Sequence, residues 1–319
     1  MKFAIDTDEP FPSAVKRIAV EQIELALDSL GNSSEDLSKS IHTARQNLKR
    51  IRALLALARG ELGDKVFERE WTCYRSAGKL LAGGRDASAL VETLDDLEQR
   101  FAYAADSDAF TSQRRFLTER RDARLKMMLE EEEALKKSSD MLVSARERVP
   151  TWPLKHEGFK AVREGLRSLY RKGREGLRGV AAHPSPTNFH TWRRPVKLLW
   201  HQLQILTPIW PAMLSAHGDE LHALSDRLNE NHDLYLLQQV LLQRQVEAQS
   251  QNCQVIIDLA GGRCRELETQ ALPLGELLYT ERPRRFTDRT ERYWRASRNR
   301  EGAVASTPTR SRAVSGGAT

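Results

Sequence analysis

The chain has 319 residues, of which 40% are hydrophobic and 29% are charged, so it can bury one large core or two modest ones. Its net charge of +6 is carried by residues 281–312, where ten arginines stand against four acids. The beginning of the sequence lacks an apolar signal-peptide core, and no run of about 18 apolar residues occurs, so we expect neither secretion nor a membrane span. The three cysteines, which lack metal-ligand spacing, fit a reducing compartment, and we expect a cytoplasmic protein.

Apolar periodicity predicts helices along the whole chain, and strand-like alternation is absent from the sequence. Residues 1–12 are predicted to be an extended lead-in, followed by a first four-helix repeat in 13–106. Residues 107–150 have the pattern of one unusually long connecting helix. A second four-helix repeat is predicted in 151–272, with separate helices near 211–229 and 233–249. Residues 273–319 are expected to form a basic tail that is disordered toward its end, where bulky apolar residues are scarce.

The same unusual helix occurs twice, as IHTARQNLKRIR in residues 41–52 and FHTWRRPVKLLW in residues 189–200. Each copy places Arg three positions and Lys seven positions after a His, which puts the three side chains on one helix face. The two stripes contain the following residues: His42, Arg45, Lys49 and Arg52 in the first, and His190, Arg193, Arg194 and Lys197 in the second. Neither copy contains an acid, so these cations repel one another unless an anion binds. The pattern therefore indicates a polyanion site, with an ordinary solvated helix face as the alternative.

Landmarks in the two halves recur at a constant separation. The two histidines of the stripes lie 148 residues apart, and Arg85-Asp86 lies 147 residues before His232-Asp233. Ala14-Val15-Lys16 likewise lies 147 residues before Ala161-Val162-Arg163. The predicted fold is therefore all-α, with two pseudo-two-fold-related four-helix bundles joined by the long helix of residues 107–150.

A further set of cations follows helical spacing in the second half, beginning at Arg163 and continuing with Arg167, Arg171 and Arg174. Lys16 occupies the related place in the first half. These residues are candidates for polyanion binding, and the alternative is that they pair with the acids of residues 130–133.

A catalytic or metal centre is not expected from the sequence. Adjacent His and Asp residues, as in His232-Asp233, occur in helical metal-dependent phosphohydrolases. The counterpart Arg85-Asp86 cannot ligate a metal in the same way, so the shared Asp is more simply explained as a helix N-cap. Phosphate-binding glycine loops and nucleophile motifs are absent from the sequence. We expect a non-enzymatic protein without metal or cofactor, and keep a phosphohydrolase as a hypothesis that requires bound metal and turnover.

The sequence has two His-x-x-Arg-x-x-x-Lys helices; Arg85-Asp86 follows the first and His232-Asp233 follows the second. This pattern resembles the CHAD domain, the conserved histidine α-helical domain, over about residues 13–270. The resemblance implies two helical bundles around a basic cleft that binds inorganic polyphosphate, with polyphosphate granules as a candidate location in the cytoplasm. Two departures leave the half-sites unequal, because Pro195 stands in the place of Asn47 and Trp200 in the place of Arg52.

The arginines of residues 281–300 are interleaved with Phe286, Tyr293 and Trp294. Basic residues beside aromatics can bind nucleic acid through phosphate contacts and base stacking. Nucleic-acid binding by this segment is therefore the alternative function, and a packed terminal helix with a solvated basic side is the structural alternative.

Overall fold

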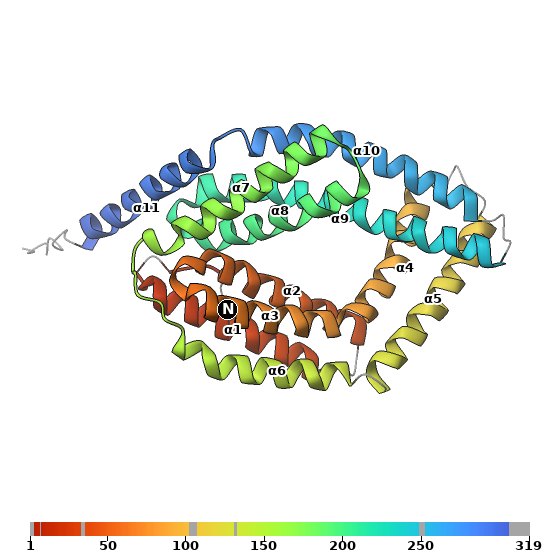
Figure 1. The fold of residues 1–319 in the computed structure, drawn as a ribbon, viewed down its shortest axis with the longest axis horizontal. Coiled ribbons are helices and arrows are strands. Elements are labelled where there is room, and N and C mark those ends of the chain that lie inside the picture. The colour runs from red at the N-terminus through yellow and green to blue at the C-terminus, as the bar shows by residue number, and fades with distance from the viewer. Residues whose placement is uncertain are drawn as a thin grey trace, which may run out of the picture.

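The computed structural model describes residues 3–6, 8–32, 36–101, 107–130, 133–248 and 253–305. Every regular element in these ranges is a helix, which confirms the all-α prediction (Figure 1). In the same ranges, the helices include none that is long and apolar enough to cross a membrane.

The elements follow in chain order as α1 (Phe11–Gly31), α2 (Leu37–Leu57), α3 (Arg59–Leu80), α4 (Ala82–Arg100), α5 (Ser107–Glu130), α6 (Ala134–Arg148), the 3-10 turn η1 (Val149–Thr151), α7 (Lys160–Ala182), α8 (Pro186–Leu206), the 3-10 turn η2 (Thr207–Ile209), α9 (Pro211–Ala248), α10 (Gln254–Leu278) and α11 (Pro283–Ala305).

The two stripe-bearing helices, α2 and α8, both begin at a side-chain cap. The carboxylate of Asp36 accepts a hydrogen bond from the backbone N–H of Lys39 at 3.0 Å. The hydroxyl of Ser185 accepts one from the backbone N–H of Asn188 at 3.3 Å, and Pro186 follows as the first residue of α8. These caps satisfy N–H groups that have no partner in the first helical turn, and so fix where each stripe starts.

Two predicted helix boundaries were wrong. The single long helix of residues 107–150 is two helices, α5 and α6, and Glu133 before α6 has the left-handed φ of 46°. Conversely, the helices predicted near 211–229 and 233–249 are one continuous helix, α9. The run Asn229-Glu230-Asn231-His232-Asp233 contains weak helix formers but no Gly or Pro, so the surrounding packing keeps it helical.

The duplication extends further along the chain than the predicted four-helix repeat. The starts of α1 and α7, of α2 and α8, and of α6 and α11 are each 149 residues apart. Helix α11 also packs on α7, as α6 packs on α1. The predicted basic tail is thus helical over most of residues 273–305 and holds the last helix of the second repeat. Disorder was predicted for residues 301–319; this is wrong for residues 301–305, which belong to α11, and residues 306–319 lie outside the described residues.

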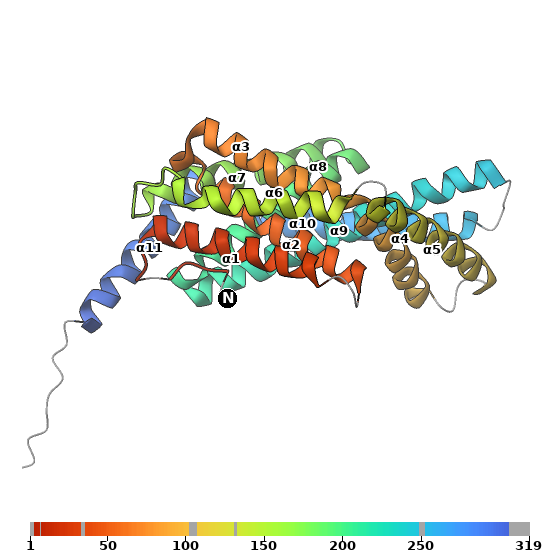
Figure 2. The same cartoon turned by 90° about the horizontal axis from the view of Figure 1, so that it is seen from below.

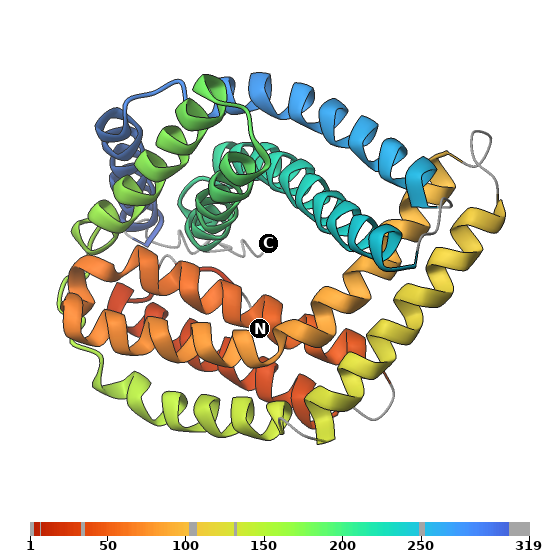
Figure 3. The ribbon, with the colours of Figure 1, turned by 45° about the vertical axis from the view of Figure 1, so that its right-hand side comes forward.

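Two hydrophobic cores organise the fold, and both take helices from both repeats. The larger core contains residues of α1, α2, α3 and α6 together with residues of α7, α8 and the first half of α9. The smaller core packs Leu90 and Leu94 of α4 and Phe110 of α5 with Leu237 of α9 and Ile256 of α10. In Figure 3 the helices are arranged in a ring, and Figure 2 places α4 and α5, which contribute to the smaller core, at the end of the molecule opposite α11.

Candidate functional site

Helices α2 and α8 pack against each other and bring the two predicted stripes together. We call the resulting group the cationic cluster: Arg45, Lys49, Arg52, Arg193, Arg194 and Lys197, joined by Arg75 of α3 and Arg85 of α4. Stripes that are 148 residues apart in sequence therefore form one positively charged surface.

Lys49 lies at the centre of the cationic cluster. Burial, followed by repulsion from Lys197, Arg45 and Arg193, lowers its pKa to about 7. The pKa of Lys197 is lowered by the same causes, burial first and then the charge of Arg193. Burial removes water from these ammonium groups while their neighbours have the same charge, so the protonated form is unfavourable until an anion approaches.

The arginines of the cationic cluster contain buried donors without acceptors. The Nε atoms of Arg45 and Arg52 are buried and have no hydrogen-bond partner among the described residues. Burial and the charges of Arg194, Arg45 and Arg75 lower the pKa of Arg52 to about 10. Buried N–H groups of this kind cost free energy unless an oxygen accepts from them.

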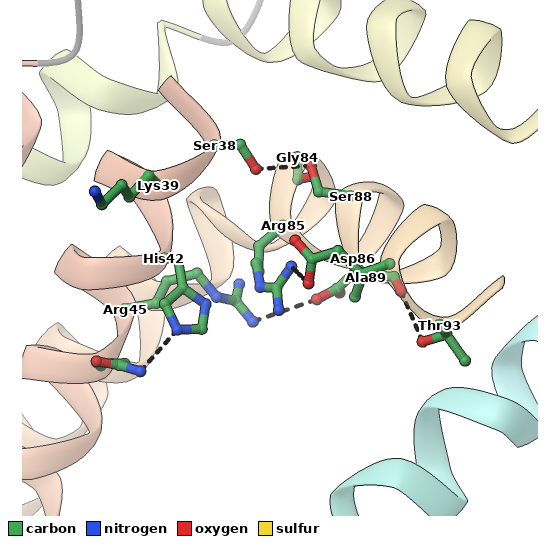
Figure 4. Close-up of polar contacts among 12 residues, drawn as sticks. Ser38, Lys39, His42, Arg45, Gly84, Arg85, Asp86, Ser88, Ala89 and Thr93 are labelled. Carbon is green, nitrogen blue, oxygen red and sulfur yellow. Dashed lines mark hydrogen bonds and ion pairs between the residues drawn. The ribbon is translucent and has the colours of Figure 1, made fainter. Parts of the chain in front are cut away.

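Two aspartates position one arginine in each stripe (Figure 4 shows the first). Arg45 donates to the carbonyl oxygen of Gly78 at 3.0 Å and to Asp86 at 3.3 Å. In the second half, Arg193 lies 3.9 Å from Asp233. These aspartates lie inside α4 and α9, so their prediction as helix N-caps was wrong, and their role is to pair with the arginines.

The histidines make different contacts in the two halves. Gln46 donates to Nε2 of His42 at 2.7 Å (Figure 4), whereas Nδ1 of His190 lies 3.0 Å from Nδ1 of His232 across α8 and α9. Burial, then the charges of Arg193 and His190, lower the pKa of His232 to about 3, so this pair is neutral at pH 7. Among the described residues, no three His, Cys, Asp or Glu side chains are grouped so as to hold a metal ion.

Three contributors to the site were absent from the predicted set. Arg85 was visible in the repeat, as the counterpart of His232, but was not assigned to the site. No repeated spacing in the sequence marks Arg75 and Trp71 of α3 as site residues. They reach the cluster only because α3 packs beside α2. The guanidinium carbons of Arg194 and Arg52 lie 5.1 Å and 5.6 Å from the centre of the Trp71 ring. An aromatic ring therefore lies beside the arginines at this end of the cationic cluster.

In the second predicted set of cations, Arg171 lines a cleft together with Arg194 of the cationic cluster, whereas three others bind neighbouring segments. Arg163 pairs with Asp288 at 2.7 Å and with Glu291, both on α11. Arg174 donates to the carbonyl oxygen of Tyr279 at 3.1 Å, and Lys16 donates to that of Pro150 at 2.7 Å. Arg167 and Arg171 are exposed on α7. Arg163, Arg174 and Lys16 thus hold neighbouring segments in place.

The aromatic residues of α11 dock this helix on the rest of the protein. Phe286 is 1% exposed and stacks on Tyr170 with ring centres 4.1 Å apart. Trp294, 9% exposed, makes an edge contact with Phe159. These two rings are therefore not available for stacking on nucleic-acid bases.

The model of the CHAD domain family matches residues 20–242. Among solved structures, the crystal structure of the CHAD domain from the plant Ricinus communis matches with a TM-score of 0.63 at 15% identity, over 87% of this chain and 94% of that one. PptA from Streptomyces chartreusis matches with a TM-score of 0.60 at 16% identity, over 86% of this chain and 100% of that one. No curated protein matches the chain.

Proposed function

Since the chain belongs to the CHAD domain family, we propose that it binds inorganic polyphosphate in the cationic cluster between α2 and α8, without catalysing a reaction. The observation that carries this proposal is the desolvated set of like charges around Lys49, whose pKa is lowered to about 7. A phosphate chain supplies closely spaced negative charges along a flexible backbone, and its oxygens accept hydrogen bonds from several cations at once.

The residues of the cationic cluster have distinct roles in this proposal. Lys49 and Lys197 act as point charges at its centre, while Arg52 and Arg194 offer planar donor groups to phosphate oxygens. Asp86 and Asp233 hold Arg45 and Arg193 in position. Burial lowers the pKa of His42 and of His190, so both imidazoles are neutral at pH 7. In this proposal they donate hydrogen bonds to phosphate oxygens without adding positive charge.

Binding of this kind releases counterions from the polymer, so affinity should rise with chain length and fall with salt. The same affinity would recruit the protein to cytoplasmic polyphosphate granules. Membrane attachment has no part in this proposal.

The test is a titration of the full chain with long-chain polyphosphate, tripolyphosphate and single-stranded DNA at two salt concentrations. The double variant Lys49→Met plus Lys197→Met removes the central charges, and Arg167→Gln plus Arg178→Gln removes two exposed charges of α7 as a matched control. We expect long-chain polyphosphate to bind most tightly, the first variant to weaken it at least tenfold, and the control to stay within about twofold. Equal weakening by both variants would show that only overall charge matters.

Nucleic-acid binding is the second candidate function, because Arg285 and Arg292 are exposed on α11. The buried positions of Phe286 and Trp294 leave phosphate contacts as its main source of affinity. Arg285→Gln plus Arg292→Gln tests it better than deletion of residues 281–319, since deletion would remove part of the larger core. Loss of DNA binding in this variant, with polyphosphate binding unchanged, would assign the two ligands to separate surfaces.

A further inference from the structure

A cleft of about 740 Å³ adjoins the cationic cluster at the Arg194 end. Its walls are formed by the end of α2 and the start of α3 on one side and by α7 and α8 on the other. Arg194 belongs to the cationic cluster and also lines the cleft, where it contacts Trp71. The cleft and the cluster are therefore continuous. The volume is within the usual range for small-molecule sites, roughly 300–1,000 Å³.

Aromatic rings form part of one wall of this cleft. Trp71 is partly exposed and stacks on the buried ring of Phe67, with ring centres 5.4 Å apart and planes 25° apart. Arg194, an exposed side chain, lies over Trp71 with its guanidinium carbon 5.1 Å from the ring centre. The exposed guanidinium group of Arg194, supported on the Trp71 ring, offers a flat surface on which another planar ring can stack.

The charges in the cleft are mixed, in contrast with those of the cationic cluster. The carboxylates of Asp64, Glu68 and Glu164 line it together with cations such as Arg59 and Lys172. Carboxylates repel a bare phosphate chain, but they accept hydrogen bonds from neutral N–H and O–H groups. The cleft therefore suits an uncharged planar group with polar donors, next to a cluster that suits phosphates.

We propose that the cleft binds the nucleoside part of a free nucleoside polyphosphate, with its base against Trp71 and Arg194 and its phosphates on the cationic cluster. The base supplies the planar ring, and its exocyclic amine and the ribose hydroxyls supply donors for the carboxylates. This inference rests on the proposed function, because the phosphate end uses the same cations as inorganic polyphosphate.

The test compares ATP with inorganic tripolyphosphate, which presents a similar charge without a nucleoside, by calorimetric titration of the full chain in a buffer containing EDTA. Base stacking on an aromatic side chain contributes about 1–3 kcal/mol, so we expect ATP to bind at least about tenfold more tightly than tripolyphosphate. Trp71→Ala should reduce the ratio of ATP affinity to tripolyphosphate affinity, both measured in this variant, to within about twofold.

A second variant tests the same idea without removing Trp71. Ser168→Phe places a bulky side chain in the opposite wall, on α7, and should abolish the preference for ATP. Ala181→Phe, at an exposed position of the same helix, is its control and should leave the preference intact. Equal affinities for ATP and tripolyphosphate in the unaltered protein, or a preference that survives Ser168→Phe, would overturn the inference.

Long-chain polyphosphate is titrated into the same proteins to separate the two proposals. If it binds while ATP shows no preference, the nucleoside inference alone fails. If neither ligand binds, the assignment of the cationic cluster fails, and the inference fails with it.

Discussion

At the scale of residues, the candidate site holds partly buried cations close to one another, which is electrostatically unfavourable in the absence of an anion. Lys49 is partly buried and surrounded by Lys197, Arg45 and Arg193, so its positive charge opposes folding. An anion that approaches this group gains the attraction of several cations and relieves their mutual repulsion. Stability and ligand affinity should therefore respond in opposite directions to substitutions here.

Replacing Lys49 with Met should stabilise the free protein and weaken polyphosphate binding. Replacing this partly buried cation, which has cations around it, with an apolar side chain of similar size should raise the free energy of unfolding by about 1–4 kcal/mol at pH 6. The folded pKa of Lys49 is about 7 and its unfolded value is 10.5, so between these values the unfolded chain binds a proton that the folded chain lacks. The stability of the original protein should therefore rise with pH in this window.

Urea unfolding at pH 6, 8 and 10 measures this effect, and the advantage of Lys49→Met over the original protein should shrink as pH rises. Lys126→Met, which removes an exposed lysine of α5, is the control and should change stability by less than about 0.5 kcal/mol at every pH. A destabilised Lys49→Met variant at pH 6 would contradict the assignment of Lys49 as a strained cation.

Polyphosphate binding at pH 8 should be accompanied by proton uptake. Lys49 is mostly neutral above pH 7 in the free protein, and a bound phosphate chain favours its protonated form. Affinity should thus decrease as pH rises from 7 to 9. Calorimetry in two buffers that differ in ionisation enthalpy gives the number of protons taken up, and this number should fall in Lys49→Met; an unchanged number would assign the proton to another group.

At the scale of elements, α11 is the second repeat's counterpart of α6 and belongs to the folded protein. Its start lies 149 residues after that of α6, and it packs on α7 as α6 packs on α1. Arg163, which we predicted to contact the ligand, instead binds Asp288 and Glu291 of this helix. The exposed basic residues of this docked helix lie on its outer side: Arg284, Arg285, Arg292 and Arg295.

Phe286→Ala should destabilise the protein strongly because Phe286 is buried between helices. Loss of a buried Phe side chain usually costs about 3–5 kcal/mol, through lost burial and the cavity left behind. Arg285→Gln, at the neighbouring exposed position, should change stability by less than about 0.5 kcal/mol. Chemical denaturation of both variants measures the difference, and similar small effects would mean that α11 is not docked as described.

At the scale of the whole molecule, the two repeats are interdependent. The smaller core packs Leu90 and Leu94 of the first repeat with Leu237 and Leu241 of the second. The cationic cluster also needs both repeats, because α2 supplies one stripe and α8 the other. Neither repeat can therefore complete its core or the site by itself.

Separate fragments of residues 1–155 and 156–319 should each lack cooperative unfolding, since each exposes half of the smaller core. Mixing them should restore helical structure and polyphosphate binding. Circular dichroism during thermal unfolding, together with polyphosphate titration of the mixture, measures both effects. A fragment that unfolds cooperatively and binds polyphosphate alone would show that one repeat is self-sufficient.

The sequence by itself determined the helical fold class, the family and the two cationic stripes. These features depend on local spacing: offsets of three and seven residues place side chains on one helix face whatever the rest of the chain does. The recurrence at a separation of 148 residues was equally visible without coordinates.

Only the tertiary structure decided which cations meet. Arg163 and Arg45 belong to similar patterns in the sequence, but Arg163 packs beside the acids of α11, whereas Arg45 lies beside Lys49 at the α2–α8 contact. Trp71 and Arg75 joined the site because α3 packs beside α2, and Asp86 became a partner of Arg45 because α4 begins at Ala82. Burial and repulsion between charges depend on distances between helices far apart in sequence, and helical periodicity has no information about those distances.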